Sequence, residues 1–168
     1  MKIDLRKLEE GVNEFSFDES SADLQLGDAS VDFASPIQTR FNVVRVGESL
    51  TASGSTSFAV RHECVRCLKS FKSSFSVDFG FILQKGEPNS QEEAEAEAII
   101  WIKEEAGLLD LSDEIRDHVL LEIPMNPVCS DDCVGLCPSC GKNLNTDTCT
   151  CTGAPGDSRW DALRELNQ

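Results

Sequence analysis

The sequence predicts an α+β fold, with an antiparallel β-sheet, one main helix and a C-terminal cysteine-rich ribbon. Three observations lead to this class. Aromatic and aliphatic residues share one parity between positions 71 and 81, which is typical of a half-buried strand. An apolar stripe at helical spacing follows at positions 111–120. Six of the eight cysteines then fall between Cys129 and Cys151.

The early elements are predicted to be strands. The segment 41–46 is rich in β-branched and aromatic residues, and Gly47 can turn the chain after it. Residues 50–60 alternate, with small polar side chains on one parity. The aromatic strand 71–81 follows the pair Cys64-Val-Arg-Cys67. We therefore expect this first cysteine pair at the turn between two antiparallel strands. The two strands would hold that turn rigidly.

The later elements follow from composition and from helix boundary signals. Residues 85–97 are polar and acidic and predict a solvated loop, whereas 98–102 predicts a short buried strand. A helix is expected to begin near Asp110 and to end before Pro124. A last helix is expected over 159–166. The domain boundaries expected are 1–125 for the sheet and helix, including the first cysteine pair, and 126–168 for the cysteine-rich ribbon and C-terminal helix.

All eight cysteines belong to close pairs, which is the arrangement that a metal needs. Two thiolates on one tight turn supply half of a tetrahedral site, and two such pairs complete it. The last six cysteines lie in a segment with few large apolar residues, so burial alone cannot order it. We therefore expect two zinc sites of four thiolates each. The expected ligands are Cys64, Cys67, Cys129, Cys133, Cys137, Cys140, Cys149 and Cys151.

Sequence order favours one partition of these cysteines. The pairs 64/67 and 129/133 would form one site, and the pairs 137/140 and 149/151 a compact local ribbon. An interleaved pairing is the alternative, because eight thiols admit many connectivities. Iron–sulfur clusters also accept four cysteines. Disulfides and a redox pair at Cys137-Pro-Ser-Cys140 are further alternatives, but the first residues show no apolar signal segment and no βαβ unit is visible. A cytoplasmic protein is expected.

The charge of the chain bears on its partners. The net charge is −15, which disfavours long-range attraction to nucleic acid. Residues 61–72 are nevertheless locally basic, whereas residues 87–122 hold twelve acids and two bases. The candidate RNA contacts are Arg61, Arg66, Lys69 and Lys72. The acidic segment is expected to be a solvated face, or a surface for a basic protein.

We expect no enzymatic activity and no small-molecule substrate. A catalytic zinc keeps one coordination position open, usually beside His or carboxylate ligands, and closed four-cysteine sites leave none. No phosphate-binding glycine loop, GxSxG or HExxH motif occurs in the chain. No stretch approaches the roughly 20 apolar residues of a membrane span, so no membrane partner is expected.

Six motifs together resemble the YceD family of large ribosomal RNA subunit accumulation proteins, found in bacteria with relatives in chloroplasts. The resemblance covers roughly residues 60–168, where order and spacing agree. Asp157-Ser158-Arg159 departs mildly from the usual Asp-Pro-Arg. The motifs are Cys64-Val-Arg-Cys67, Leu120-Leu-Glu-Ile-Pro124, Cys129-Ser-Asp-Asp-Cys133, Gly135-Leu-Cys-Pro-Ser-Cys-Gly141, Asn143-Leu-Asn145 and Asp157-Ser-Arg-Trp-Asp-Ala-Leu163.

The resemblance implies a non-enzymatic role in the accumulation or processing of large-subunit ribosomal RNA, and so in ribosome assembly. Relatives that lack the last four cysteines imply that 64/67 and 129/133 form one unit, in agreement with the partition above. The implied partners are large-subunit ribosomal RNA, ribosomal proteins, or both. The alternatives are a zinc-ribbon adaptor that binds a basic ribosomal protein without touching RNA, and a thiol-redox protein.

Overall fold

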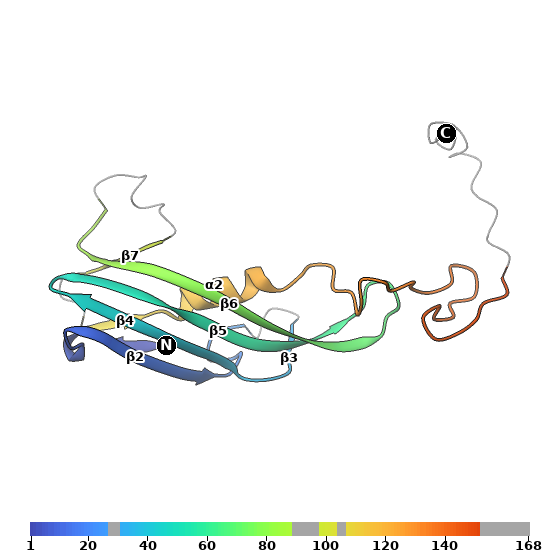
Figure 1. Cartoon of the computed structure of the whole chain (residues 1–168), viewed down its shortest axis with the longest axis horizontal. Coiled ribbons are helices and arrows are strands. Elements are labelled where there is room, and N and C mark those ends of the chain that lie inside the picture. Colours follow the sequence, from blue (N-terminus) through green and yellow to red (C-terminus); the bar gives the residue numbers. More distant parts are fainter. Residues whose placement is uncertain (27–30, 89–97, 104–106, 152–168) are drawn as a thin grey trace, which may run out of the picture. The chain divides into compact units, whose positions relative to one another are not determined.

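A computed structural model describes residues 1–26, 31–88, 98–103 and 107–151 of the chain (Figure 1). The helix expected over 159–166 and most of the acidic loop expected over 85–97 lie outside these residues. The chain forms two compact units. The first unit comprises Met1–His62 and Lys72–Met125, and the second comprises Glu63–Phe71 and Asn126–Gln168. The turn with the first cysteine pair thus belongs to the second unit, together with the other six cysteines.

The expected fold class is confirmed, with a sheet that is mostly antiparallel. The main sheet has the strand order β2-β4-β5-β6-β7, and β3 also pairs with β5. β2 pairs antiparallel with β4, and β4 with β5, whereas β7 joins β6 in parallel. A separate two-stranded sheet pairs β1 with β8. The elements are β1 Lys2–Asp4, η1 Leu5–Lys7, β2 Gly11–Glu19, β3 Asp32–Phe33, β4 Ile37–Val46, β5 Ser49–Glu63, β6 Ser70–Lys85, β7 Ile99–Ile102, β8 Leu108–Asp110 and α2 Ser112–Glu122.

The alternation of residue types along the strands fixes which face of the sheet is buried. In β4, Ile37 and the inward residues that follow it alternate with exposed polar positions. β6 shows the expected alternation, and its inward side chains become buried toward Phe79 and Phe81. The side chains of Ile115 and Val119 from α2 belong to the same core. The first unit therefore has an ordinary hydrophobic core, built by one face of the sheet and one side of the helix.

The helix α2 begins and ends close to the expected positions. The Asp110 carboxylate accepts hydrogen bonds from the backbone N–H of Ser112 (3.1 Å) and from its hydroxyl (2.6 Å). Leu111 and the two inward helical residues are fully buried, but Leu120, which the sequence placed in the apolar stripe, is 38% exposed and lies outside the buried face. The helix ends at Glu122, before Pro124. None of the helices in the described residues is long and apolar enough to cross a membrane.

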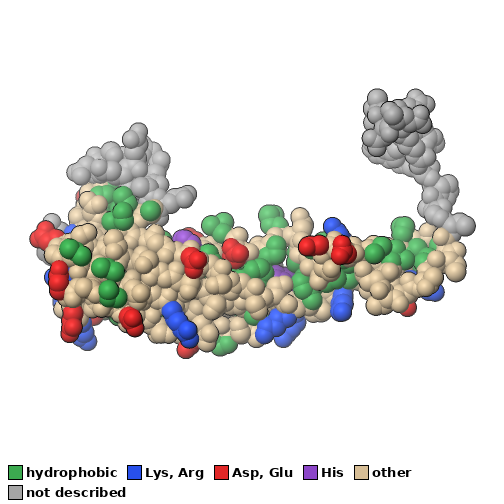
Figure 2. Space-filling model, in the orientation of Figure 1, with side chains coloured by type: hydrophobic (Ala, Val, Ile, Leu, Met, Phe, Trp, Pro, Cys, Tyr) green, Lys and Arg blue, Asp and Glu red, His purple; other side chains and the backbone are tan. Residues whose placement is uncertain are grey.

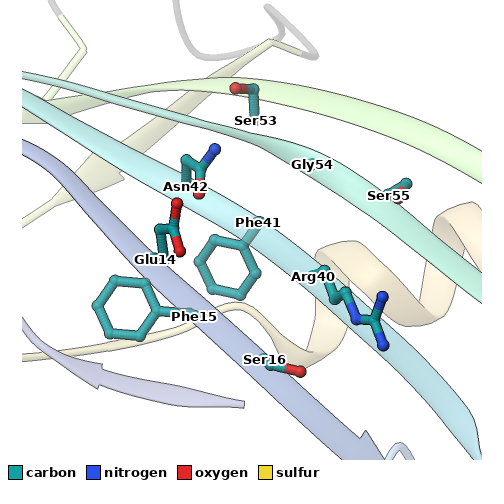
Figure 3. Close-up of a pocket in the computed structure, with 9 residues that line it drawn as sticks. All are labelled: Glu14, Phe15, Ser16, Arg40, Phe41, Asn42, Ser53, Gly54 and Ser55. Atoms are coloured by element: carbon teal, nitrogen blue, oxygen red, sulfur yellow. The ribbon is translucent and has the colours of Figure 1, made fainter.

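Gly54 of β5 marks a close approach between two strands. It lies directly opposite Phe41 of β4 in the sheet register, beside an open, shallow depression (Figure 3). A Cβ atom at position 54 would overlap the Arg40 carbonyl oxygen and the backbone and Cβ of Phe41. The depression carries one acid, Glu14, and one base, Arg40, among polar and apolar neighbours. It presents no convergent set of catalytic groups.

Gly54→Ala is expected to lower the free energy of unfolding by about 1–3 kcal/mol, because the added methyl group forces β4 and β5 apart. The matched control is Gly80→Ala in β6, where a Cβ would lie 4.0 Å from its nearest neighbour, the Ala52 carbonyl oxygen. Urea unfolding of both variants measures the difference. Equal stability of the two variants would contradict the crowding at Gly54.

Candidate metal centre

The first cysteine pair is presented by the tight turn between β5 and β6. The backbone N–H of Cys64 donates to the Lys69 carbonyl oxygen (2.9 Å), and that of Leu68 donates to the Cys64 carbonyl oxygen (2.9 Å). Leu68 adopts a left-handed conformation with φ +57°, which closes the turn. This geometry holds the Cys64 and Cys67 side chains together, as the sequence predicted for a turn between strands.

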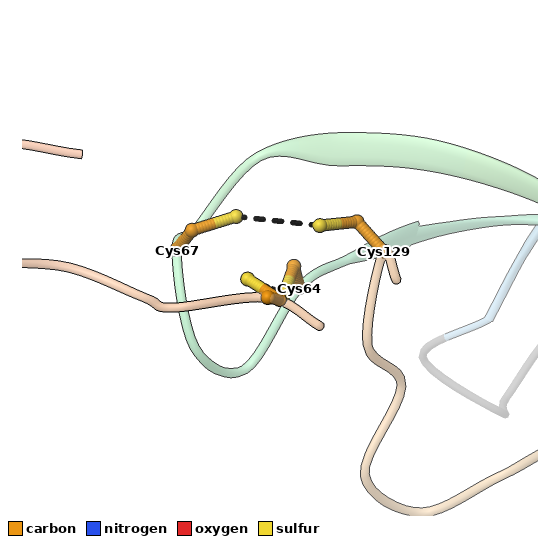
Figure 4. Close-up of side chains that lie close together, drawn as sticks. Cys64, Cys67 and Cys129 are labelled. Carbon is orange, nitrogen blue, oxygen red and sulfur yellow. Dashed lines mark hydrogen bonds between the residues drawn. The ribbon is translucent and has the colours of Figure 1, made fainter. Parts of the chain in front are cut away.

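The second pair reaches the same place from the segment after α2. The backbone N–H of Val65 donates to the Pro127 carbonyl oxygen (3.0 Å), which fastens this segment to the turn. The sulfur of Cys64 lies 3.8 Å from that of Cys133. The sulfur of Cys67 lies 3.6 Å from that of Cys129 (Figure 4). All four sulfurs lie within 4.8 Å of one another. We call these four residues cluster 1.

The spacing in cluster 1 fits a metal and not a disulfide. Four sulfurs placed tetrahedrally around one ion with bonds of about 2.3 Å lie about 3.8 Å apart. A disulfide needs a separation of about 2.05 Å. Cys64, Cys67 and Cys133 are buried, and a small group of partly buried residues packs against them. That group is Phe71, Val128, Cys129 and Leu136. The cysteines are therefore most of the core of this region.

Cluster 2 is formed by Cys137, Cys140, Cys149 and Cys151, whose sulfurs also lie within 4.8 Å of one another. The sulfur of Cys149 lies 3.3 Å from that of Cys137 and 3.6 Å from that of Cys140. The turn is closed by the N–H of Gly141, with φ +72°, which donates to the Cys137 carbonyl oxygen (2.9 Å). Cys140 and Cys151 are exposed. Cluster 2 is therefore more open to solvent than cluster 1.

Backbone N–H donors lower the pKa of one thiol in each cluster, which favours the thiolate form that a metal binds. The N–H groups of Cys140 and Ser139 lower the pKa of the Cys137 thiol to about 6. Burial opposes the ionisation of Cys64, but the surrounding backbone N–H groups outweigh burial and lower its pKa to about 6. A metal binds the thiolate form, so a lowered pKa reduces the proton competition at these two ligands.

Hydrogen bonds between cysteines of the same cluster raise the pKa of other sulfurs. A hydrogen bond with Cys67 raises the pKa of Cys129 to about 12, and one with Cys149 raises the pKa of Cys151 to about 12. Each cluster thus combines a ready thiolate with a thiol whose proton must leave when a metal binds. The grouping of the sulfurs is the one that sequence order favoured, and it is not the interleaved alternative.

Arg66, expected from the sequence to contact RNA, makes structural contacts inside the second unit. One guanidinium nitrogen, Nη1, donates to the carbonyl oxygens of Asp131 (3.1 Å) and Cys133 (3.0 Å). These bonds join the first cysteine turn to the loop that carries the second pair. Sequence reasoning missed this role, because the two carbonyl groups lie more than sixty residues away along the chain.

The other three candidate RNA contacts differ in whether their side chains form ion pairs within the protein. Arg61 forms an ion pair with Asp32 at 2.6 Å. Lys69 and Lys72 are exposed, and neither forms an ion pair with the described residues. On the face shown in Figure 2, Lys and Arg side chains lie in separate groups among Asp and Glu side chains. Lys69 and Lys72 are therefore the freest of the four to meet an anionic ligand.

Chelation of metal under reducing conditions is expected to unfold the second unit and to leave the first unit folded. Structural zinc sites supply on the order of 10 kcal/mol to folding, and the described residues of the second unit have little other core to replace that contribution. Hydrogen exchange at the backbone amides of Cys64, Cys137 and Gly141 should accelerate strongly, whereas amides of β4 should keep their protection. Equal acceleration in β4, or no change in the cysteine loops, would contradict this division.

Comparison with known proteins places these clusters in a family. The profile described as Large ribosomal RNA subunit accumulation protein YceD matches residues 52–167, a span that contains all eight cysteines. That description names an RNA accumulation role and no reaction. No solved structure matches the chain.

Individual relatives agree with this match. An uncharacterized protein of Mycobacterium tuberculosis is 29% identical over 143 residues, which cover 82% of this chain and 65% of the relative. The chloroplast protein of Arabidopsis thaliana named large ribosomal RNA subunit accumulation protein YCED homolog 1 is 29% identical over 157 residues, or 79% of this chain and 49% of the relative. The chain therefore spans less than two thirds of the length of these relatives. With its family profile matched over residues 52–167, the chain belongs to the YceD family.

Proposed function

We propose that this protein is a non-enzymatic, zinc-stabilised factor for the accumulation or processing of large-subunit ribosomal RNA, acting in ribosome assembly in the cytoplasm. The observation that carries the proposal is the match to the YceD family across residues 52–167. The relative in Arabidopsis thaliana bears the same description in its name. The two cysteine clusters lie inside the matched region, so the proposed metal sites belong to the part of the chain that resembles the family.

Zinc is the metal that the clusters favour. Closed sets of four thiolates are the common solution for structural zinc, and both clusters consist of cysteine alone. All eight thiols are used in the two sets, so neither cluster keeps a spare thiol for disulfide exchange. This supports two structural zinc ions per chain over a thiol-redox role. Iron–sulfur ligation uses the same residues and differs in colour and in sulfide content.

The direct ligand is proposed to be ribosomal RNA, a ribosomal protein, or both. Lys69 and Lys72 are exposed and unpaired among the described residues, which suits phosphate contacts. The net charge of −15 favours the second candidate, an adaptor that binds a basic ribosomal protein without touching RNA. Direct RNA contact predicts that removal of the two lysines weakens RNA binding, whereas the adaptor predicts no such effect.

The cellular role can be tested in an organism from which the gene has been deleted. Loss of the protein should lower the ratio of large-subunit to small-subunit ribosomal RNA, and the full-length gene should restore it. A variant with Cys64→Ser and Cys133→Ser should fail to restore the ratio, because cluster 1 cannot form. An unchanged ratio in the deletion strain would count against the proposed role.

Direct RNA binding can be tested with Lys69→Ala and Lys72→Ala, made singly and together. If these side chains contact phosphates, each loss should weaken binding to large-subunit RNA fragments and reduce the magnitude of the salt-dependence slope by about 1. Lys7→Ala with Lys85→Ala is the matched control, since it changes the net charge equally at exposed positions elsewhere.

Filter binding over a range of salt concentrations measures both quantities, with pull-down of purified ribosomal proteins beside it. If the lysine variants and the control bind RNA alike while a ribosomal protein binds tightly, the adaptor role replaces direct RNA contact. Arg66 is left unchanged in these variants, because its removal would disturb cluster 1 as well as the charge.

A further inference from the structure

The loop that closes cluster 2 also touches a sulfur of cluster 1. Asn145 lies between Cys140 and Cys149, and therefore inside the loop of cluster 2. Its side-chain nitrogen Nδ2 donates to the Cys133 sulfur at 3.4 Å. Its side-chain oxygen Oδ1 accepts a hydrogen bond from the backbone N–H of Val134 at 2.9 Å. One amide group thus contacts both a proposed ligand of cluster 1 and the residue that follows it.

The position of Asn145 is fixed by the fold of its own loop. The Asn143 side-chain oxygen accepts from both the backbone N–H (3.0 Å) and Nδ2 (2.8 Å) of Asn145. The backbone N–H of Leu144 donates to the Gly135 carbonyl oxygen (2.9 Å), and the N–H of Asp147 donates to the Asn143 carbonyl oxygen (2.8 Å). This loop is held at its ends by Cys140 and Cys149, so closing cluster 2 places the amide against Cys133.

A second connection runs through the backbone. The N–H of Leu136, which lies between the two clusters in the sequence, donates to the Arg66 carbonyl oxygen at 3.1 Å. Arg66 in turn lies between the two cysteines of the first turn. Gly135 is required beside it, because it has φ +81° and a Cβ there would lie 3.0 Å from the same Arg66 oxygen. The segment that leads into Cys137 is therefore hydrogen-bonded directly to the turn of cluster 1.

A hydrogen bond to a ligand sulfur changes how well the sulfur binds a metal. The donor stabilises the thiolate and fixes its orientation, and loss of such outer partners typically costs 10–100-fold in metal affinity. Cys133 receives this donor from a loop that belongs to the other cluster. The free energy of binding in cluster 1 must then depend on whether cluster 2 is formed, and by linkage the dependence is reciprocal.

We propose that Asn145 is a positioning residue that couples the two clusters, so that metal binding in cluster 2 tightens metal binding in cluster 1. The inference rests on the proposed zinc binding but not on the proposed role in ribosomal RNA accumulation. It concerns residues that are not metal ligands themselves, and it gives the Asn143-Leu-Asn145 segment a physical task. Assembly of the second unit then proceeds as one cooperative step.

The test uses the full chain, zinc buffered by a chelator, and alkylation of each cysteine read by mass spectrometry, which reports the two clusters separately. Four proteins form a double-mutant cycle. They are the wild type, Asn145→Ala, the cluster 2 variant Cys149→Ser with Cys151→Ser, and the combination of all three changes. Thr148→Ala is the matched control, since this exposed side chain lies in the same loop and makes no hydrogen bond among the described residues.

Asn145→Ala should weaken zinc protection of Cys64 and Cys67 by 10–100-fold while protection of Cys137 and Cys140 changes far less. The cluster 2 variant should weaken cluster 1 by at least as much, and the combination should be no worse than the cluster 2 variant alone. Asn145→Asp, which keeps the acceptor for Val134 but removes the donor to sulfur, should behave like Asn145→Ala. Thr148→Ala should match the wild type.

Two results would overturn the coupling. If zinc protects the cluster 1 cysteines of Asn145→Ala from alkylation as well as it does in the wild type, the Asn145 amide does not affect metal binding in cluster 1. Additive losses in the combined variant show that Asn145 acts without cluster 2. If the wild type takes up two zinc ions and either result is found, only this inference fails. If the wild type takes up no zinc at all, the proposed zinc binding fails with it.

Discussion

The convergence of eight sulfurs into two sets of four is the constraint on which the second unit depends. Its described residues contain few large apolar side chains, and the buried group around cluster 1 consists largely of the cysteines themselves. Thiolates at separations of 3.3–3.8 Å repel one another unless protons or a cation lie between them. A bound metal would remove that repulsion and would supply the order that a hydrophobic core supplies elsewhere.

The first unit is ordered instead by the burial of apolar side chains. One face of its sheet and the inward side of α2 share a continuous core, in which buried polar groups such as Thr39 and Thr56 are hydrogen-bonded to each other at 3.0 Å. The long strands β5 and β6 lead into the turn of the first cysteine pair, and the end of α2 leads toward the second pair. The proposed metal sites thus begin where regular secondary structure ends, and their loops are shaped by hydrogen bonds to backbone groups.

Much of the fold and of the two clusters could be predicted from patterns among residues that are close together in the sequence. The alternation that ends in Phe79 and Phe81 predicted β6, the stripe from Leu111 to Leu120 predicted α2, and the close cysteine pairs predicted the two clusters. The parallel pairing of β7 with β6 was not predicted, nor was the pairing of β1 with β8. β1 and β8 are far apart in the sequence, and a strand as short as β7 has no residue pattern that specifies its neighbour or its direction.

The roles of Arg66 and Asn145 show the same limit at the level of single side chains. Arg66 was assigned to RNA from its charge, because a basic residue beside a metal-binding turn has the composition of a phosphate contact. In the structure it also donates to two carbonyl groups of a distant loop, whereas its contact with RNA remains a prediction. Asn145 was recognised only as part of a family motif, since its contact with Cys133 needs the ribbon to fold back on the first cluster. In both cases the chemistry of the side chain was visible, but its partner was decided by tertiary structure.

The most direct test of this account is the metal content of freshly purified protein, measured by elemental mass spectrometry together with a visible absorption spectrum. Two zinc ions per chain and a colourless protein are expected, since both clusters are closed sets of four thiolates. A brown protein with iron and sulfide would contradict the assignment to zinc. A protein that holds no metal, while its second unit remains ordered, would contradict the claim that metal organises this part of the chain.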